Sequence, residues 1–486
     1  MSAGTLEHAD RKKGSSGAGS EQSPKRTKKD MANALVETLA RGAAHTDKPE
    51  SAEPPSSPRQ SEGARLMRVL ALGFALRLAV LAFSPNFVSK HLTTRVELGT
   101  PVTSYKRLVE GLHLAAQGIS PFDGGLFHQS PLLLILFRVP FGWLPRIFSD
   151  ALFVAADVLV ALVLAKIAAN KIALPGFARR PLVPGETAFR CPPSAVAMLY
   201  LFNPLTLATC LARSTIVFSH LATASALYFG TSGQIDIAIA LAAVATHLSL
   251  YPAVLVAPLS LMAGGALQSR SESKPRSSFS VAGAVLALCK FATCFAAIHL
   301  LFVLLYGSQY FSATFEFTLK ATDLQPNVGL FWYFFIEIFD EFRQFFIAVF
   351  QLTALAFTVP ISWRFRSDPL FGSVMLVGVI SALKSYPSWG DLSLFLSLIP
   401  IYEELVKYMQ YTFLSANLLL YGVGLAPVFW HLWIEQGSGN ANFFYAATLV
   451  YVFGQITLLF DLGSAQLRRQ LDIEHPETRE KTVVQE

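Results

Sequence analysis

Long apolar runs alternate with short polar segments over most of the chain. Each run approaches the roughly 20 residues that a helix needs to cross the hydrocarbon core of a bilayer. The first predicted span covers Leu66–Phe83, and the whole pattern indicates about twelve spans. We therefore predict an all-α polytopic membrane domain over residues 64–465.

Lysine and arginine gather between the apolar runs, and cytosolic loops of membrane proteins carry an excess of these residues. The predicted cytosolic clusters lie at residues 166–180, 270–276, 364–366 and 468–469. The segments assigned to the opposite side are residues 84–129, 306–327, 386–391 and 431–442. Both termini then lie in the cytosol. Only one of two neighbouring runs can cross under this scheme, so the proline-interrupted run at 131–145 is predicted to be re-entrant or interfacial.

Two polar segments flank the membrane domain. Residues 1–63 are rich in Ser, Gly, Ala, Pro, Lys and Glu. Such a composition cannot bury a hydrophobic core, so this segment is predicted to be a disordered cytosolic tail. Residues 466–486, which follow the last predicted span, are assigned to a C-terminal cytosolic tail.

The composition agrees with a membrane protein. Hydrophobic residues make up 52% of the chain and charged residues only 15%, whereas about a quarter of a soluble domain is charged. The net charge of +6 arises from clusters that flank the predicted spans. It therefore does not indicate a nucleic-acid partner.

Residues 323–346 combine many aromatic and acidic side chains. At roughly 100° per residue, one stripe of a predicted helix holds Phe331, Phe335, Phe339, Phe342 and Phe346. The opposite side holds Glu337, Asp340, Glu341 and Gln344. We expect the stripe to pack in the bundle or against acyl chains, and the acidic side to face a polar groove or a partner. Asn327, at the end of the turn "DLQPN", is the expected cap of this helix.

Three ionisable residues interrupt apolar runs, namely Asp157, His247 and Lys384. A charge at the centre of a bilayer costs roughly 2.5–3.5 kcal/mol on insertion scales. These side chains are therefore expected to face the interior of the bundle and to pair there. An interhelical hydrogen bond and a contact to a ligand are equally good interpretations of each.

Sequence motifs of catalysis are few. The chain has no P-loop, no G-x-S-x-G, no HExxH and no glycine-rich dinucleotide motif outside the tail. None of the four cysteines lies in a basic, polar context that would favour a thiolate. The first large non-cytosolic loop contains Glu97, Glu110 and Asp123, without the closely spaced acidic pair expected of an enzyme that uses lipid-linked sugars. Glu97 alone could still serve as a base. No metal and no cofactor are predicted.

Several long blocks of this sequence resemble the U subunit of the glycosylphosphatidylinositol (GPI) transamidase. Besides residues 323–346, the blocks are "TPVTSYKRLVEG", "GISPFDGGLFHQSPLLL", "LYLFNPLTLATCLARST", "HLSLYP", "KSYPSWGD" and "PVFWHLWIEQGSGNANFFYAATL". They occur in order from Leu66 to the last span. The resemblance implies a multispan, noncatalytic subunit of an endoplasmic reticulum complex that attaches GPI to protein C-termini, with the catalytic cysteine on another subunit. It also implies other transamidase subunits and the GPI lipid as partners, and a membrane bundle similar to that of the GPI mannosyltransferases.

The candidate GPI-binding residues are polar side chains on the predicted lumenal side. They are Asn440, Asn442, Glu337, Lys384, Asp391 and Asn327. A carboxamide both donates and accepts hydrogen bonds, which suits hydroxyls and phosphate. A lysine suits a phosphate, and a carboxylate suits an amine. Ordinary turns and helix caps remain alternative interpretations of these residues.

Two other functions compete with the scaffold. The first is a mannosyltransferase that uses a lipid-linked sugar, with Glu97 or Asp123 as its base. The second is a transporter, although no pair of corresponding interrupted helices indicates inverted repeats.

Overall fold

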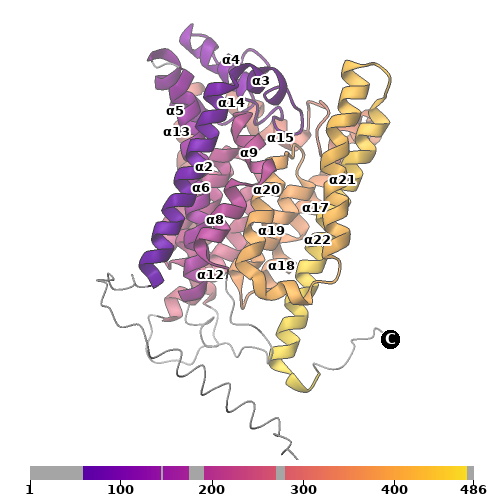
Figure 1. The fold of residues 1–486 in the computed structure, drawn as a ribbon. Helices are drawn as coiled ribbons and strands as arrows, with labels where there is room; N and C mark the ends of the chain where they lie inside the picture. The colour runs from indigo at the N-terminus through magenta and orange to yellow at the C-terminus, as the bar shows by residue number, and fades with distance from the viewer. Residues whose placement is uncertain (1–57, 144–145, 174–190, 270–279, 479–486) are drawn as a thin grey trace, which may run out of the picture. The chain divides into compact units, whose positions relative to one another are not determined.

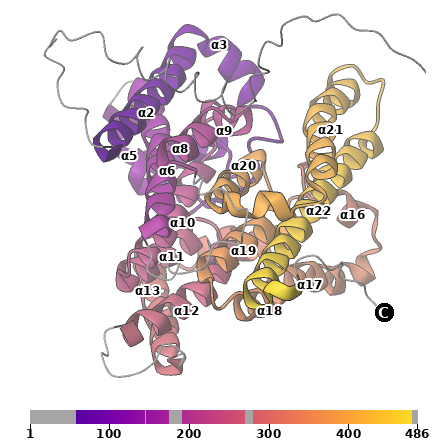
Figure 2. The same ribbon diagram turned by 60° about the horizontal axis from the view of Figure 1, so that its bottom comes forward.

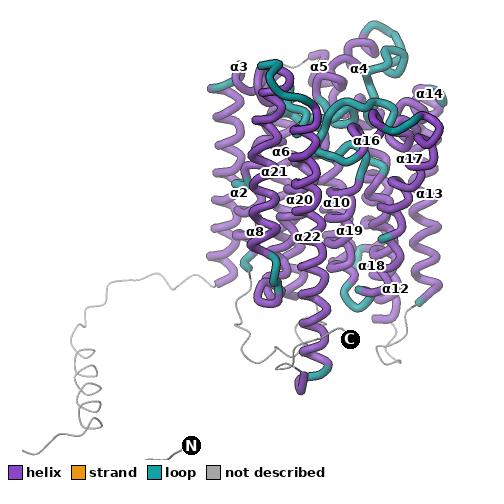
Figure 3. The backbone as a smooth tube through the Cα atoms, turned by 90° about the vertical axis from the view of Figure 1, so that its right-hand side faces the viewer, coloured by secondary structure: helices purple, strands orange, loops and turns teal. Residues whose placement is uncertain are grey.

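A computed structural model describes residues 58–143, 146–173, 191–269 and 280–478 of the chain. All regular secondary structure in these ranges is helical. The helices run alongside one another in a bundle, with a cap of short helices and loops at one end (Figures 1 and 3). The expected all-α polytopic class is confirmed.

Six helical segments in the described ranges are long and apolar enough to cross a membrane. They are formed by α2 (Pro58–Phe83), α6 (Arg146–Ala173), α13 (Val281–Tyr306), α17 (Asp340–Ala356) with α18 (Thr358–Arg364), α21 (Thr412–Trp430) with η5 (His431–Glu435), and α22 (Ala441–Glu474). A seventh crossing arises if α8 (Pro193–Leu201) and α9 (Pro204–Leu211), which meet at an angle of 58°, form one broken span. The first predicted span lies within α2. The count of twelve is not reached by this criterion.

Shorter apolar helices fill the middle of the bundle. They are α10 (Ile216–Thr231), α11 (Ile235–Leu248), η2 (Tyr251–Leu255) with α12 (Val256–Ser269), α19 (Pro369–Leu383), and α20 (Trp389–Leu398) with η4 (Ile399–Tyr408). Most side chains of α10 and α19 are buried around the whole helix. A helix that is apolar on every side belongs in an interior, so these helices form the centre around which the longer ones pack.

Short elements gather at one end of the bundle (Figures 1 and 3). They are α3 (Pro85–Phe87), η1 (Val88–Leu92), α4 (Tyr105–Ala116), α5 (Pro131–Trp143), α14 (Gln309–Phe311), η3 (Ser312–Glu316), α15 (Phe317–Lys320) and α16 (Phe331–Glu337). Hydrogen bonds join segments far apart in sequence. The Arg107 guanidinium binds the Asp323 carboxylate at 2.7 Å, and the Trp389 amide donates to the Glu97 carbonyl at 2.8 Å. The segments predicted to share one side of the membrane therefore share one end of the bundle.

The proline-interrupted run forms α5, a helix of 13 residues that packs against α4 and α6. It is shorter than the roughly 20 residues of a full crossing. At the opposite end of the bundle, the Arg364 guanidinium reaches Gln470 at 3.3 Å, which brings two of the predicted cytosolic clusters together. The cluster at 270–276 and residues 174–180 of the cluster at 166–180 lie outside the described residues.

A buried ion pair and a tyrosine hydroxyl join three helices of the first half of the chain. The Arg77 guanidinium on α2 binds the Asp157 carboxylate on α6 at 2.6 Å, and neither side chain is more than 1% exposed. The Tyr200 hydroxyl on α8 donates to the same carboxylate at 2.7 Å. The buried Asp157 carboxylate is thus paired with the opposite charge, as expected.

The predicted single helix over Phe331–Phe346 is wrong. The chain breaks after α16, where Phe339 adopts extended backbone angles (φ −64°, ψ 140°), and α17 starts at Asp340. Phe331 and Phe335 are buried, but Phe339 is 74% exposed and Phe342 is 56% exposed. The two parts of the stripe therefore face different surroundings.

Two further boundaries differ from the prediction. Residues 58–63, assigned to the N-terminal tail, form the start of α2, and residues 466–474, assigned to the C-terminal tail, continue α22. The remainder of the predicted N-terminal tail and residues 479–486 lie outside the described residues.

The last two long helices form a tightly packed hairpin (Figure 2). The Asp461 carboxylate on α22 accepts hydrogen bonds from the Gln410 and Tyr411 amides, which precede α21, at 2.8 and 2.9 Å. A Cβ added to Gly422 on α21 would lie 2.7 Å from the Tyr451 Cα on α22. Gly422 therefore allows the two backbones to approach closely.

We predict that Gly422→Leu loosens this hairpin, whereas Gly424→Leu does not. A side chain at position 422 meets backbone that cannot move aside, and overpacking of this kind costs about 1–3 kcal/mol. A Cβ at Gly424, two residues along the same helix, has no atom within 4 Å. The thermal unfolding midpoints of the purified variants test this prediction. Equal midpoints for the two variants would contradict it.

Candidate functional site

The six candidate residues occupy three places in the structure. Lys384 and Asp391 are buried together inside the bundle. Asn327 lies in a buried turn next to the same loop. The other three candidates are exposed. Asn440 and Asn442 lie at the start of α22, and Glu337 is the last residue of α16.

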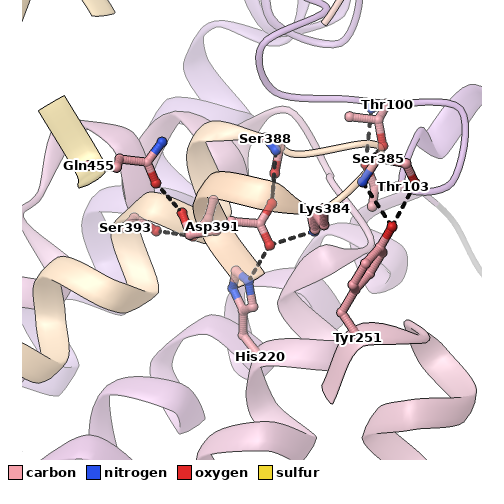
Figure 4. A network of polar contacts seen from close by, with 12 residues as sticks. Thr100, Thr103, His220, Tyr251, Lys384, Ser385, Ser388, Asp391, Ser393 and Gln455 are labelled. Atoms are coloured by element: carbon pink, nitrogen blue, oxygen red, sulfur yellow. Dashed lines mark hydrogen bonds and ion pairs between the residues drawn. The ribbon is translucent and has the colours of Figure 1, made fainter. Parts of the chain in front are cut away.

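Lys384 and Asp391 form an ion pair that closes the loop between α19 and α20 (Figure 4). The Lys384 Nζ lies 2.5 Å from the Asp391 Oδ1. The other carboxylate oxygen accepts hydrogen bonds from the Ser388 amide at 2.8 Å and the Ser388 hydroxyl at 3.1 Å, which caps the start of α20. His220 of α10 approaches the carboxylate to 3.8 Å. The sequence of this segment was also compatible with an ordinary turn and helix cap. The structure shows both, since Asp391 and Ser388 cap the start of α20.

A second network of hydrogen bonds, around Tyr251 and Ser385, holds the same loop (Figure 4). The Tyr251 hydroxyl accepts a hydrogen bond from the Ser385 amide at 2.9 Å and contacts Gln351 of α17 at 2.9 Å. The Ser385 hydroxyl donates to the Thr318 carbonyl at 3.0 Å. Residues from four separate parts of the chain thereby set the position of Lys384.

A small polar cavity lies next to this loop. Its polar lining includes His128, Ser219, His247, Tyr251, Lys384 and Tyr386. His247, one of the three interior ionisable residues noted in the sequence, makes a hydrogen bond between its Nδ1 and the Ser130 hydroxyl at 2.9 Å. The interior pairing that was expected for His247 is therefore found.

His128 is held rigidly at the edge of this cavity. Its ring stacks on Phe317 with centroids 3.6 Å apart, and its nitrogens contact the Ala313 and Gly125 carbonyls at 2.8 and 3.1 Å. Burial lowers the pKa of His128 below its usual value, so the ring is neutral at neutral pH. Among the described residues no group of three or more His, Cys, Asp or Glu is arranged to hold a metal ion.

Asn327 stabilises a turn and does not cap the helix that follows. Its Oδ1 accepts a hydrogen bond from the Gly329 amide at 2.8 Å, and its Nδ2 donates to the Gln325 carbonyl at 3.1 Å. The residue before α16 is Leu330, which makes no side-chain cap. Asn327 is 1% exposed, so a ligand in solution cannot reach it without a movement of the turn.

Asn440 and Asn442 have different roles at the start of α22. The Asn440 Oδ1 accepts hydrogen bonds from the Asn442 and Phe443 amides at 3.1 and 3.4 Å, so Asn440 is the N-cap of the helix. The Asn442 Oδ1 accepts a hydrogen bond from the Tyr333 hydroxyl of α16. The structure thus brings Asn442 together with the aromatic segment, over a separation of 109 residues.

An aromatic cluster supports these exposed polar groups. Tyr333 stacks on Tyr445 with ring centroids 4.6 Å apart, and the Tyr445 hydroxyl donates to the Leu330 carbonyl at 3.2 Å. Trp332 is 1% exposed and packs against Trp433 and Phe444. Glu337 lies one helical turn after Tyr333 and is exposed. We call Tyr333, Glu337, Asn440, Asn442 and Tyr445 the carboxamide patch.

Glu97 and Asp123, the candidate bases of a mannosyltransferase, do not form a catalytic pair. Glu97 is 0% exposed, and both of its carboxylate oxygens bind the Arg95 guanidinium, at 2.6 and 3.0 Å. Asp123 is exposed in the cap. Neither residue lines the polar cavity.

Sequence reasoning missed Tyr333, Tyr251 and Tyr386. The first was counted among the packing aromatics, and the other two lie in the "HLSLYP" and "KSYPSWGD" blocks without having been singled out. A tyrosine carries a polar hydroxyl on an apolar ring, and a buried hydroxyl needs a partner. That signal distinguishes these tyrosines from the phenylalanines around them.

Comparison with known proteins gives one consistent family. The family model described as GPI transamidase subunit PIG-U matches residues 71–451. The chain is 34% identical over 429 residues to the GPI-anchor transamidase component PIGU of Homo sapiens, covering 85% of this chain and 96% of that protein. It is 34% identical over 416 residues to the GPI transamidase component GAB1 of Saccharomyces cerevisiae, covering 83% and 95%.

We predict that Lys384→Met destabilises the fold because it leaves the Asp391 carboxylate buried without its cation. Removal of one partner of a buried pair costs roughly 3–5 kcal/mol. Lys320→Met is the matched control, since Lys320 pairs with Glu316 on the surface and its side chain is 67% exposed. That change costs about 0–1 kcal/mol. The measurement is the unfolding midpoint, and similar losses in both variants would refute a structural role for the buried pair.

Proposed function

Because the chain belongs to the PIG-U family of GPI transamidase subunits, we propose that it holds the GPI lipid for attachment to protein C-termini and leaves the bond chemistry to another subunit. The role of transamidase subunit follows from the family itself. The relatives named above match over nearly their whole length. The finer assignment, to the holding of GPI, rests on the chemistry of the carboxamide patch.

The observation that carries this proposal is the position of Asn442. Its carboxamide is exposed at the capped end of the bundle, and its oxygen is fixed by the Tyr333 hydroxyl. The Tyr333 ring is in turn held by its stacking on Tyr445. A polar group that is both accessible and fixed by neighbours is preorganised for a ligand, which lowers the entropic cost of binding.

The donors and acceptors of the patch suit the headgroup of a GPI lipid. Because the Oδ1 atoms of Asn440 and Asn442 accept hydrogen bonds from the protein, their Nδ2 groups remain to donate to phosphate or hydroxyl oxygens. The exposed Glu337 carboxylate suits an amine or a hydroxyl donor. Lys384 and Asp391 neutralise each other inside the bundle, so in this proposal they hold the loop and do not contact GPI directly.

Twelve crossings also form part of the proposal. The six long segments, the broken span, the four shorter apolar helices and the α20–η4 segment account for this number if each crosses once. The shorter helices need fewer residues because they lie inside protein and need not match the full thickness of lipid. With an even number, both termini lie on the same side. We assign that side to the cytosol and the capped end to the lumen of the endoplasmic reticulum.

The partners in this proposal are the other transamidase subunits and the GPI lipid, within a membrane bundle of the GPI mannosyltransferase type. Several long helices support such an assembly, because α13 and α17 bury only small parts of their surface within this chain. A mannosyltransferase activity is not supported by the family, and the binding of both Glu97 oxygens by Arg95 weighs against that residue as a base.

We predict that Asn442→Ala reduces the GPI retained by the complex by roughly 2- to 10-fold, since one hydrogen bond contributes about 0.5–1.5 kcal/mol. Tyr333→Phe removes the hydroxyl that fixes Asn442 and should act in the same direction with a smaller effect. The measurement is the amount of GPI that co-purifies with the assembled complex, determined by mass spectrometry, together with the attachment of GPI to a reporter protein.

Asn417→Ala on α21 is the control for this series, because the Asn417 Nδ2 donates only to the Phe413 carbonyl of its own helix. It should retain GPI at the level of the unchanged protein. The proposal fails if Asn442→Ala, Glu337→Gln and Asn417→Ala all assemble normally and retain equal amounts of GPI.

A further inference from the structure

Two arginines lie close together at the end of the bundle opposite the cap, where the segment formed by α17 and α18 ends (Figure 1). Arg364 is the last residue of α18, Arg366 lies two positions further on, and both residues are exposed. Arg364 reaches Gln470 of α22 at 3.3 Å, and Arg366 donates to the Trp363 carbonyl at 3.1 Å. We call Arg364 and Arg366 the arginine pair. It is separate from the carboxamide patch, which lies at the capped end.

The charges of the arginine pair are not balanced within the described ranges of the chain. The partner of Arg364 is a neutral carboxamide, the partner of Arg366 is a backbone carbonyl, and neither guanidinium makes an ion pair there. The nearest carboxylate in the sequence, Asp368, is buried, caps the start of α19 and accepts a hydrogen bond from the Tyr402 hydroxyl. Because a guanidinium has five N–H donors, most donors of the pair remain available for an anion.

Trp363 places the arginine pair at the level of a membrane–water interface. Its side chain is 59% exposed, and the Arg366 guanidinium lies 4.8 Å from the centroid of its ring. A tryptophan at the end of a spanning helix is typical of the headgroup level of a bilayer, and the face of its ring attracts a cation. The ring therefore holds the Arg366 charge at the depth of the lipid headgroups.

An apolar ridge leads from Trp363 back along the same candidate span. It consists of Leu352, Leu355 and Val359, which are all exposed. Their spacing of three or four residues places them on one face of a helix. An acyl chain can lie against this ridge while the phosphate of the same lipid reaches the arginine pair. Free phosphate or an acidic segment of a soluble protein would use the arginines alone and leave the ridge without an apolar partner.

From these observations we propose that the arginine pair and the apolar ridge together bind an anionic phospholipid. Guanidinium groups match phosphate oxygens with parallel N–H donors. A lipid with a net negative charge supplies the countercharge that the described chain lacks, whereas a zwitterionic lipid carries its own cation. The orientation proposed above places this end in the cytosolic leaflet, which is the anionic one in cells. Binding in a synthetic bilayer depends neither on that orientation nor on the holding of GPI.

The test uses the assembled complex in phosphatidylcholine nanodiscs that contain a small, subsaturating fraction of phosphatidic acid with a photoreactive diazirine in its acyl chain. Mass spectrometry of the digested protein then measures the yield of cross-links on the apolar ridge. We expect this yield to fall roughly 5-fold for Arg364→Gln or Arg366→Gln and roughly 25-fold for the double variant, because each basic residue at an anionic membrane surface contributes a factor of about five to binding. Arg364→Lys and Arg366→Lys keep the charge and should keep most of the yield.

Lys290→Gln is the matched control. It removes the same charge from a partly exposed side chain, but Lys290 is already paired with Asp236 at 2.5 Å. The yield at the ridge should therefore stay unchanged. Unfolding midpoints show whether each variant is intact, and the single variants decide the test if the double variant does not assemble.

Several results would overturn the proposal. One is a full yield in both single glutamine variants, and another is equal labelling of the ridge by phosphatidylcholine that carries the same diazirine. Displacement of the probe by an equal concentration of inorganic phosphate would assign the arginines to a free anion, and displacement by polyglutamate would assign them to an acidic protein segment. Displacement by unlabelled phosphatidic acid alone supports the proposal.

GPI retention, measured in the same preparations, separates this proposal from the proposed function. Loss of cross-linking with normal GPI retention leaves the role of the carboxamide patch intact. Loss of GPI retention in Asn442→Ala with normal cross-linking leaves the phospholipid site intact.

Discussion

The constraint on which the structure depends is that no charge can remain unpaired inside an apolar bundle. An isolated ion in a medium of low dielectric constant carries a penalty of several kcal/mol, and lipid offers no water to relieve it. The Arg77–Asp157 and Lys384–Asp391 pairs meet this requirement in different places. The first joins the long helices α2 and α6, and the second closes a loop between two short central helices. Both pairs therefore determine which helices become neighbours.

The same constraint explains why the polar surfaces lie at one end. Once Lys384 and Asp391 are paired, the loop that carries them is fixed beneath the cap, and the cavity forms between this loop and α10 and α11. The carboxamide patch lies where α16 meets α22 at the same end. The paired charges in the interior thus support a cap whose exposed polar surface includes the carboxamide patch.

The sequence predicted the features that depend on a local pattern of apolar residues or on the energetic cost of burying one charged side chain. The first span, the helical class and the interior pairing of Asp157, His247 and Lys384 follow from apolar runs and from the cost of a buried charge. The break at Phe339 was not predictable, because the stripe of phenylalanines continues through it with helical spacing. The contact between Tyr333 and Asn442 joins residues 109 positions apart, and no periodicity contains such information. Asn440 was correctly considered as an N-cap, since that role is local.

The measurement that tests the account most directly is a lipid analysis of cells depleted of this chain and labelled with a sugar precursor. If the chain holds GPI for transfer, complete GPI should accumulate while precursor proteins remain unprocessed. Re-expression of the unchanged chain should reverse both effects, and the Asn442→Ala variant should reverse them only in part. Accumulation of mannose-poor intermediates in place of complete GPI would contradict the account and place the chain among the enzymes that build the glycan.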